Sequence, residues 1–193
     1  MALAKSSWTA DARGFSILET LVATTIMIVA VASLGQLFAV STQRNRSAKN
    51  TGVAAVLAQQ KMEQLRGLTW GFDTLGLPTT DTTTDTTVVP ESANGGTGLA
   101  PSPGGTLRQN TLGFVDYLDA QGRSLGGATT NTPATAVYIR RWAIEPLPTN
   151  PNNTIVIQVL VTRHRDRGTA DQGNSPRLPD EARVVSVKTR KAQ

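Results

Sequence analysis

The fold is decided by the stretch Leu21-Val-Ala-Thr-Thr-Ile-Met-Ile-Val-Ala-Val-Ala-Ser-Leu-Gly-Gln-Leu-Phe-Ala-Val40. No residue from Thr20 to Gln43 is charged, and about 20 apolar residues suffice to cross a bilayer as a helix. The Thr, Ser, Gly and Gln residues in the run predict only moderately favourable insertion, which leaves room for a protein contact to share the burial. No other segment of the sequence is long and apolar enough to span a membrane.

The helical pattern continues beyond Val40. Three basic residues end the apolar run: Arg44, Arg46 and Lys49. A largely apolar series then follows at a spacing of four, Val53, Leu57, Lys61 and Leu65, and it predicts an amphipathic continuation of the helix. We expect one helix from Phe15 to Arg66, about 75 Å long, with Gly67 as its stop and Gly35 and Gly52 as points where it bends easily.

The rest of the chain predicts a small sheet with long loops. Residues 71–135 are rich in Thr, Gly, Pro and Ser, so we expect surface loops that contribute little to a core, interrupted by one short strand, Phe114–Leu118. Alternating apolar residues predict three further strands at Ala136–Glu145, Ile155–Thr162 and Arg183–Thr189. The predicted fold class is therefore α+β, with a long N-terminal helix packed on a small antiparallel sheet.

Composition argues against enzymatic chemistry. The 193 residues include no cysteine and one histidine, His164, so thiolate chemistry and metal sites built from several histidines are excluded. We predict no catalytic residue, no cofactor and no metal. The formal net charge of +5 permits an anionic partner without requiring one.

The residues in front of the apolar run are the most informative. A short polar stretch, Met1–Arg13, precedes Gly14-Phe-Ser-Ile-Leu-Glu19. A glycine at the border of an apolar segment, a large apolar residue after it and a carboxylate five residues on resemble the class III signal of type IV prepilins and type II secretion pseudopilins. The specific match covers about residues 1–40; the long helix and the sheet make the chain most similar to the minor pilins.

This resemblance implies a role for each residue of the motif. Gly14 would be the cleavage site of a prepilin peptidase and methyltransferase, Phe15 the methylated mature N-terminus, and Glu19 the charge that sets the axial register between subunits. An acid at the start of a spanning helix costs about 2 kcal/mol or more unless it meets a cation, and the resemblance supplies one in the N-terminal amine of a neighbouring subunit.

The resemblance also implies a division of the chain and a location. Residues 1–14 would be the leader, 15–40 the transmembrane and filament-core helix, 41–67 its amphipathic continuation, 68–135 a loop-rich region and 136–193 the sheet of the head. The protein would sit in the inner membrane with a periplasmic head and then enter a pilus or pseudopilus. The helix would contact the membrane and other pilins through residues that include Leu21, Ile26, Ile28, Val31, Leu34, Leu37 and Phe38.

Two other interpretations of the N-terminus remain open. The chain could be an uncleaved bitopic membrane protein with a periplasmic binding domain, because positive charges flank both sides of the span and do not fix its orientation. Alternatively, Ala30-Val-Ala32 has the form of a signal-peptidase site, and cleavage there would release a soluble domain that begins at Ser33.

The C-terminal strand region carries the one hint of a further partner. Eight Lys or Arg residues lie between Arg163 and Lys191. They could hold DNA phosphates through salt-sensitive contacts, or they could simply guard a sheet edge against aggregation.

Overall fold

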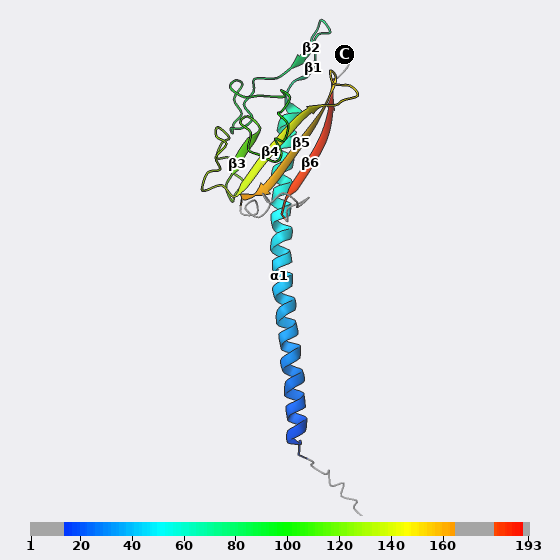
Figure 1. Cartoon of the computed structure of the whole chain (residues 1–193), viewed down its shortest axis with the longest axis vertical. Coiled ribbons are helices and arrows are strands. Elements are labelled where there is room, and N and C mark those ends of the chain that lie inside the picture. Colours follow the sequence, from blue (N-terminus) through cyan, green and yellow to red (C-terminus); the bar gives the residue numbers. More distant parts are fainter. Residues whose placement is uncertain (1–13, 165–179, 191–193) are drawn as a thin grey trace, which may run out of the picture. The chain divides into compact units, whose positions relative to one another are not determined.

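The long helix forms as predicted. The computed structural model describes residues 14–164 and 180–190, and the chain forms two compact units, residues 1–45 and 46–193. Helix α1 runs without interruption from Ile17 to Gly67, through Gly35 and Gly52. In the described part of the chain it is followed by strands β1 (Trp70–Phe72), β2 (Pro78–Thr80), β3 (Val115–Leu118), β4 (Tyr138–Pro146), β5 (Thr154–Arg163) and β6 (Ala182–Thr189) (Figure 1).

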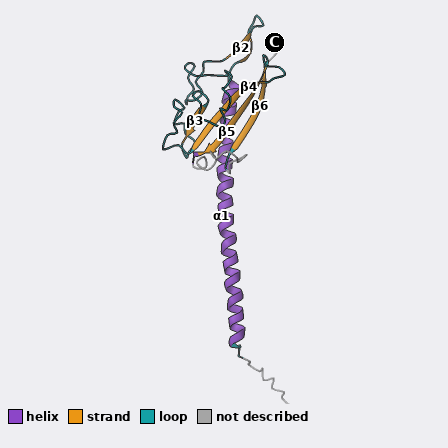
Figure 2. Cartoon of the chain, in the orientation of Figure 1, coloured by secondary structure: helices purple, strands orange, loops and turns teal. Residues whose placement is uncertain are grey.

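The head contains the predicted antiparallel sheet. Its strand order is β3-β4-β5-β6, so each strand pairs with its neighbours in the chain, and Figure 2 shows the four strands side by side. All three pairings are antiparallel, and the observed ends of these strands lie within two residues of the predicted ones. The predicted α+β fold class is confirmed.

The core lies between this sheet and the C-terminal part of α1. The inner residues of β5, Ile155, Ile157, Val159 and Val161, are at most 1% exposed. They pack in one cluster with Trp142 and Tyr138 of β4. The helix contributes the small and apolar side chains of one face, Ala54, Leu57, Ala58, Met62 and Leu65. Each fully buried Leu, Ile, Val or Met side chain contributes about 1.5–3 kcal/mol.

The prediction that residues 71–135 add little to the core is wrong in part. Leu99 and Phe114 belong to the main apolar cluster, and four threonines of this region are buried, Thr84, Thr86, Thr87 and Thr106. The polar composition is compatible with burial for Thr84, Thr87 and Thr106, because their hydroxyl groups find acceptors nearby. Thr84 Oγ1 donates to Asp81 Oδ2 at 2.6 Å, and Thr87 Oγ1 donates to Asp85 Oδ1 at 2.7 Å.

The hairpin β1–β2 was not predicted, because each of its strands has three residues and its support comes from the far end of the chain. Arg190 lies over the ring of Trp70, with 3.7 Å between the guanidinium carbon and the ring centroid. Its Nη atoms donate to Gly71 O at 2.9 Å, Thr79 O at 2.6 Å and Thr80 Oγ1 at 2.8 Å. One arginine thus fastens the hairpin in a chain that has no cysteine.

Candidate processing and assembly site

Helix α1 begins just after the glycine of the predicted motif. The hydroxyl Oγ of Ser16 accepts the Leu18 N–H at 3.3 Å, and Ser16 O accepts the Thr20 N–H at 3.1 Å, so Ser16 is the N-cap. Gly14 and Phe15 precede the helix and are exposed, Phe15 at 79%. A Cβ atom at Gly14 would meet no atom within 4 Å, so local packing does not explain a glycine there. The rest of the predicted leader, residues 1–13, lies outside the described residues.

Glu19 lies in the first turn of α1 and is exposed. Among residues 14–164 and 180–190, no basic side chain forms an ion pair with it. A carboxylate in the first turn interacts favourably with the helix dipole, but this is worth only about 0.3–1 kcal/mol. That gain is smaller than the cost of placing the same carboxylate inside a bilayer, so the membrane interpretation still requires a cation from outside this chain's described residues.

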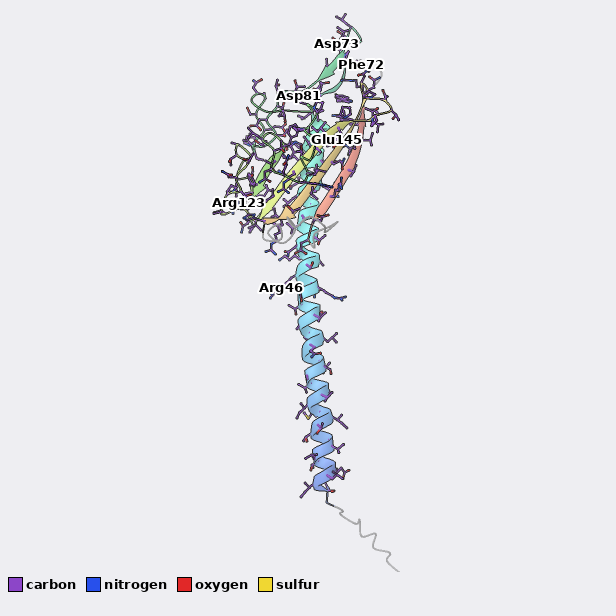
Figure 3. All side chains as sticks on the ribbon, viewed as in Figure 1. Arg46, Phe72, Asp73, Asp81, Arg123 and Glu145 are labelled. Carbon is purple, nitrogen blue, oxygen red and sulfur yellow. The ribbon has the colours of Figure 1, made fainter. Side chains whose placement is uncertain are left out.

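The apolar residues predicted for the span are uncovered. Their exposed fractions lie between 54% and 70% for the set Leu21, Ile26, Ile28, Val31, Leu34, Leu37 and Phe38, and Figure 3 shows side chains projecting from this part of the helix on all sides. The described residues contain one helix long and apolar enough to cross a membrane, α1, although a signal sequence passes the same test. A helix that is apolar all round requires a bilayer or other protein around it.

The hydroxyl side chains within the apolar run are satisfied by the helix itself. Thr24 Oγ1 donates to Thr20 O at 2.9 Å, Thr25 Oγ1 to Leu21 O at 2.8 Å, and Ser33 Oγ to Val29 O at 2.8 Å. Each hydroxyl therefore bonds to a carbonyl one turn earlier. These residues weaken membrane insertion less than the composition alone indicates, because none of the three hydroxyls is left without an acceptor in an apolar environment.

Sequence reasoning missed a buried ion cluster in the head, formed by Lys61 of α1, Asp116 of β3 and Arg140 of β4. Arg140 holds the Asp116 carboxylate with two hydrogen bonds, Nε to Oδ1 at 2.9 Å and Nη2 to Oδ2 at 2.7 Å. Lys61 Nζ lies 3.0 Å from Asp116 Oδ2, and both side chains are fully buried. Arg140 Nη1 also donates to Leu57 O at 3.0 Å. The cluster therefore joins the helix to two strands.

Lys61 uses its remaining donors within the protein. Its Nζ donates to Gln64 Oε1 at 3.0 Å and to Thr86 O, and it lies 4.1 Å from the ring centroid of Trp142. Burial lowers the pKa of Lys61 to about 8, although the charge of Asp116 acts in the opposite direction. Since every charged group of the cluster has ion-pair or hydrogen-bond partners, the cluster is a structural contact between helix and sheet and not an open reactive site. The available signal was Lys61, a charged residue in the apolar series of the helix.

Among the described basic residues near the C-terminus, Arg183, Lys188 and Arg190 form hydrogen bonds within the fold. Lys188 Nζ donates to Arg66 O at 2.7 Å and to Leu68 O, so it satisfies carbonyl groups at the C-terminal end of α1. Arg190 holds the hairpin β1–β2. Arg183 donates to Gln158 Oε1. Arg165, Arg167, Arg177 and Lys191 lie outside the described residues, so DNA binding stays a prediction. His164 is exposed, and the described part of the chain has no group of three or more side chains suited to hold a metal.

Comparison with known proteins supplies no relative. No family model matches the chain, and no curated protein and no solved structure matches it. The interpretation of the N-terminal motif therefore depends on the residues of this chain and on the geometry around them.

Proposed function

We propose that this protein is a non-enzymatic, prepilin-like subunit of the minor pilin or pseudopilin type. The observation that carries the proposal is the sequence Gly14-Phe-Ser-Ile-Leu-Glu19 at the start of a helix whose apolar side chains are uncovered on all sides. A folded head on the C-terminal part of the same helix supports it further, since a subunit of this type needs both an anchor and an exposed domain.

The proposed mechanism is processing followed by assembly. A prepilin peptidase cuts after Gly14, where the exposed backbone has no side chain to obstruct it, and the new amine of Phe15 is methylated. The helix then holds the subunit in the inner membrane by its apolar surface. On assembly into a type IV pilus or a type II secretion pseudopilus, the apolar surfaces of neighbouring helices replace the lipid, and Glu19 pairs with the N-terminal amine of a neighbour.

A matched pair of glycine variants tests the processing step in native cells. Gly14→Val places a branched side chain at the scissile bond, and we expect the leader to remain attached. Gly35→Val is the control, because a Cβ atom at either glycine would meet no atom within 4 Å, so neither change disturbs packing in the chain. Mass spectrometry of the N-terminal peptide reports the result. Equal processing of the two variants would contradict the assignment of Gly14.

A further inference from the structure

The two outer strands of the head sheet, β3 and β6, differ in whether another segment pairs with the outer edge. Along β3 the segment that follows covers the edge: Leu125 N–H donates to Tyr117 O at 2.8 Å, and Tyr117 N–H donates to Gly126 O at 3.1 Å. Along β6 no other described strand pairs with the outer edge, because the order of the sheet ends there (Figure 1). The edge of β6 is thus the one available for pairing in the described part of the sheet.

The middle of β6, Val184–Val187, carries neither a charge nor a proline. Natural edge strands carry charges, prolines or bulges that deter pairing. Between Arg183 and Lys188, β6 reads Val-Val-Ser-Val, and its register with β5 is continuous from Ala182 to Thr189. The Lys188 ammonium is turned to the carbonyls at the end of α1 and does not guard the edge. Val185 and Val187 are 55% and 58% exposed on the outer face of the strand.

A hollow of about 400 Å³ adjoins this edge. One wall of the hollow is formed by Val187, Lys188 and Thr189 near the end of β6, and the Lys188 side chain reaches from this strand to the end of α1. Its other wall is formed by the end of α1 and the start of β1. The lining residues are Arg66, Leu68, Trp70, Val187, Lys188 and Thr189.

The hollow carries positive charge without a matching carboxylate in its lining. Arg66 has one acidic neighbour, Glu63, at 3.1 Å, and that pair is solvent-exposed on both sides. Lys188 donates to backbone carbonyls only. Burial lowers the pKa of Lys188, and the nearby charge of Arg66 lowers it further. An anionic group in the hollow would relieve this repulsion.

We infer that the edge of β6 is a docking site for an extended, anionic segment of a partner protein, which adds to the sheet as a fifth strand and places a carboxylate in the hollow beside Arg66 and Lys188. Main-chain hydrogen bonds supply binding energy in this mode, and alternate side chains supply the specificity. The inference does not depend on the proposed function, because each residue it uses lies in the head.

The geometry fixes the order of residues in the partner strand. In an antiparallel pair, opposed residues share a face. The partner residue opposite Lys188 therefore points to the hollow and is acidic, and those opposite Val187 and Val185 are aliphatic. All strand pairs in this sheet are antiparallel, so we expect antiparallel addition. Read from its N-terminus, the partner strand then has the motif acid-aliphatic-any-aliphatic.

Hydrogen exchange on the full chain in detergent micelles tests this inference. The probe is the end-capped peptide Thr-Ser-Glu-Val-Thr-Val-Ser-Thr, and its control has Gln in place of Glu. The direction of each β6 amide follows from Arg190, whose N–H donates to Asn153 O at the end of β5. Backbone groups alternate in direction along an antiparallel ladder. The amides of Val184 and Ser186 therefore face β5, and those of Val185 and Val187 point outward. At peptide concentrations up to about 1 mM, we expect exchange at Val185 and Val187 to slow about tenfold, with no change at Val184 and Ser186.

Two arginine variants separate specific docking from general charge attraction. Arg66→Gln should weaken peptide binding about tenfold, as should the Gln peptide. Arg123→Gln is the matched control, an exposed arginine paired with Asp119 at 3.7 Å that lies at the opposite end of the head from Phe72 of the hairpin (Figure 3). The inference would be overturned if exchange at Val185 and Val187 did not slow, or if the two variants had equal effects on binding. It would also be overturned if exchange slowed without peptide as the protein concentration rose, and that result would assign the edge to a second copy of this chain.

Discussion

Lys61 of α1 and Asp116 of β3 form a fully buried ion pair, with Nζ and Oδ2 3.0 Å apart, and Arg140 of β4 donates to both oxygens of the same carboxylate. One carboxylate thus compensates two cations at the junction between helix and sheet. Removing charges from water is costly, and the cluster is tolerable because each group also bonds to neighbouring backbone or side-chain atoms. The pair therefore fixes where the sheet sits on the helix and makes the head sensitive to the loss of its acid.

Asp116→Ala should destabilise the head strongly, because it leaves Lys61 and Arg140 buried without an anion. We expect the free energy of unfolding to fall by about 3–5 kcal/mol. Lys61→Met should cost clearly less, since Arg140 still pairs with Asp116. Urea denaturation followed by tryptophan fluorescence measures both changes. Glu63→Ala removes an exposed carboxylate from the same helix and is the control, expected within about 0.5 kcal/mol of the wild type. Equal losses for Asp116→Ala and Glu63→Ala would refute this account of the cluster.

The stability of the head should rise with pH between about 8 and 10.5. Burial lowers the pKa of Lys61 from 10.5 to about 8 in the folded state. In this window the unfolded chain binds more protons at Lys61 than the folded chain, so the free energy of unfolding increases as the pH rises. The pKa of Lys188 is lowered too, so the contribution of Lys61 is the difference between the wild type and Lys61→Met. Parallel curves for the two proteins would show that Lys61 is not the source.

Arg190→Lys should loosen the hairpin β1–β2 while it keeps the charge. A lysine cannot reproduce the stacking on Trp70 or the forked hydrogen bonds to Gly71, Thr79 and Thr80. We expect faster amide exchange in residues 70–80, with the core strands β4 and β5 unchanged. Arg123→Lys, at an exposed ion pair, is the comparison variant and should leave exchange in the hairpin as it is. An unchanged hairpin in Arg190→Lys would mean that charge alone holds it.

Glu19→Ala should leave cleavage after Gly14 largely intact and impair incorporation into a filament. The proposed role of Glu19 is to pair with the amine of a neighbouring subunit, and this pairing occurs after processing. Glu63→Ala, on the same helix but within the head, should assemble normally. The amount of subunit in sheared filaments, compared with the amount in the membrane, measures the effect. Normal incorporation of Glu19→Ala would remove the register role but not the processing assignment.

Local pattern predicted most of the fold. The apolar series of α1 and the alternation in β4, β5 and β6 are periodic signals, and these elements formed within two residues of their expected ends. The hairpin β1–β2 and the buried threonines could not be predicted in this way, because they depend on contacts between distant residues such as Arg190 with Trp70 and Lys61 with Thr86. The pattern placed Asp116 in a short strand, and only the folded chain brings it to Lys61 and Arg140.

For the candidate site, the residues came from the sequence and the structure added less. Gly14, Phe15 and Glu19 were identified by their order in the chain, and the structure adds that no local packing requires the glycine and that no described cation neutralises the glutamate. Their proposed partners, a peptidase and neighbouring subunits, are other molecules. The fold of one chain therefore constrains these roles without deciding them.

The most direct test of the central proposal is mass spectrometry of the N-terminal peptide of the protein isolated from native cells. The proposal predicts a peptide that begins at N-methylated Phe15, after loss of residues 1–14. An intact leader would contradict it in favour of an uncleaved bitopic membrane protein. A peptide that begins at Ser33 would contradict it in favour of a secreted soluble domain.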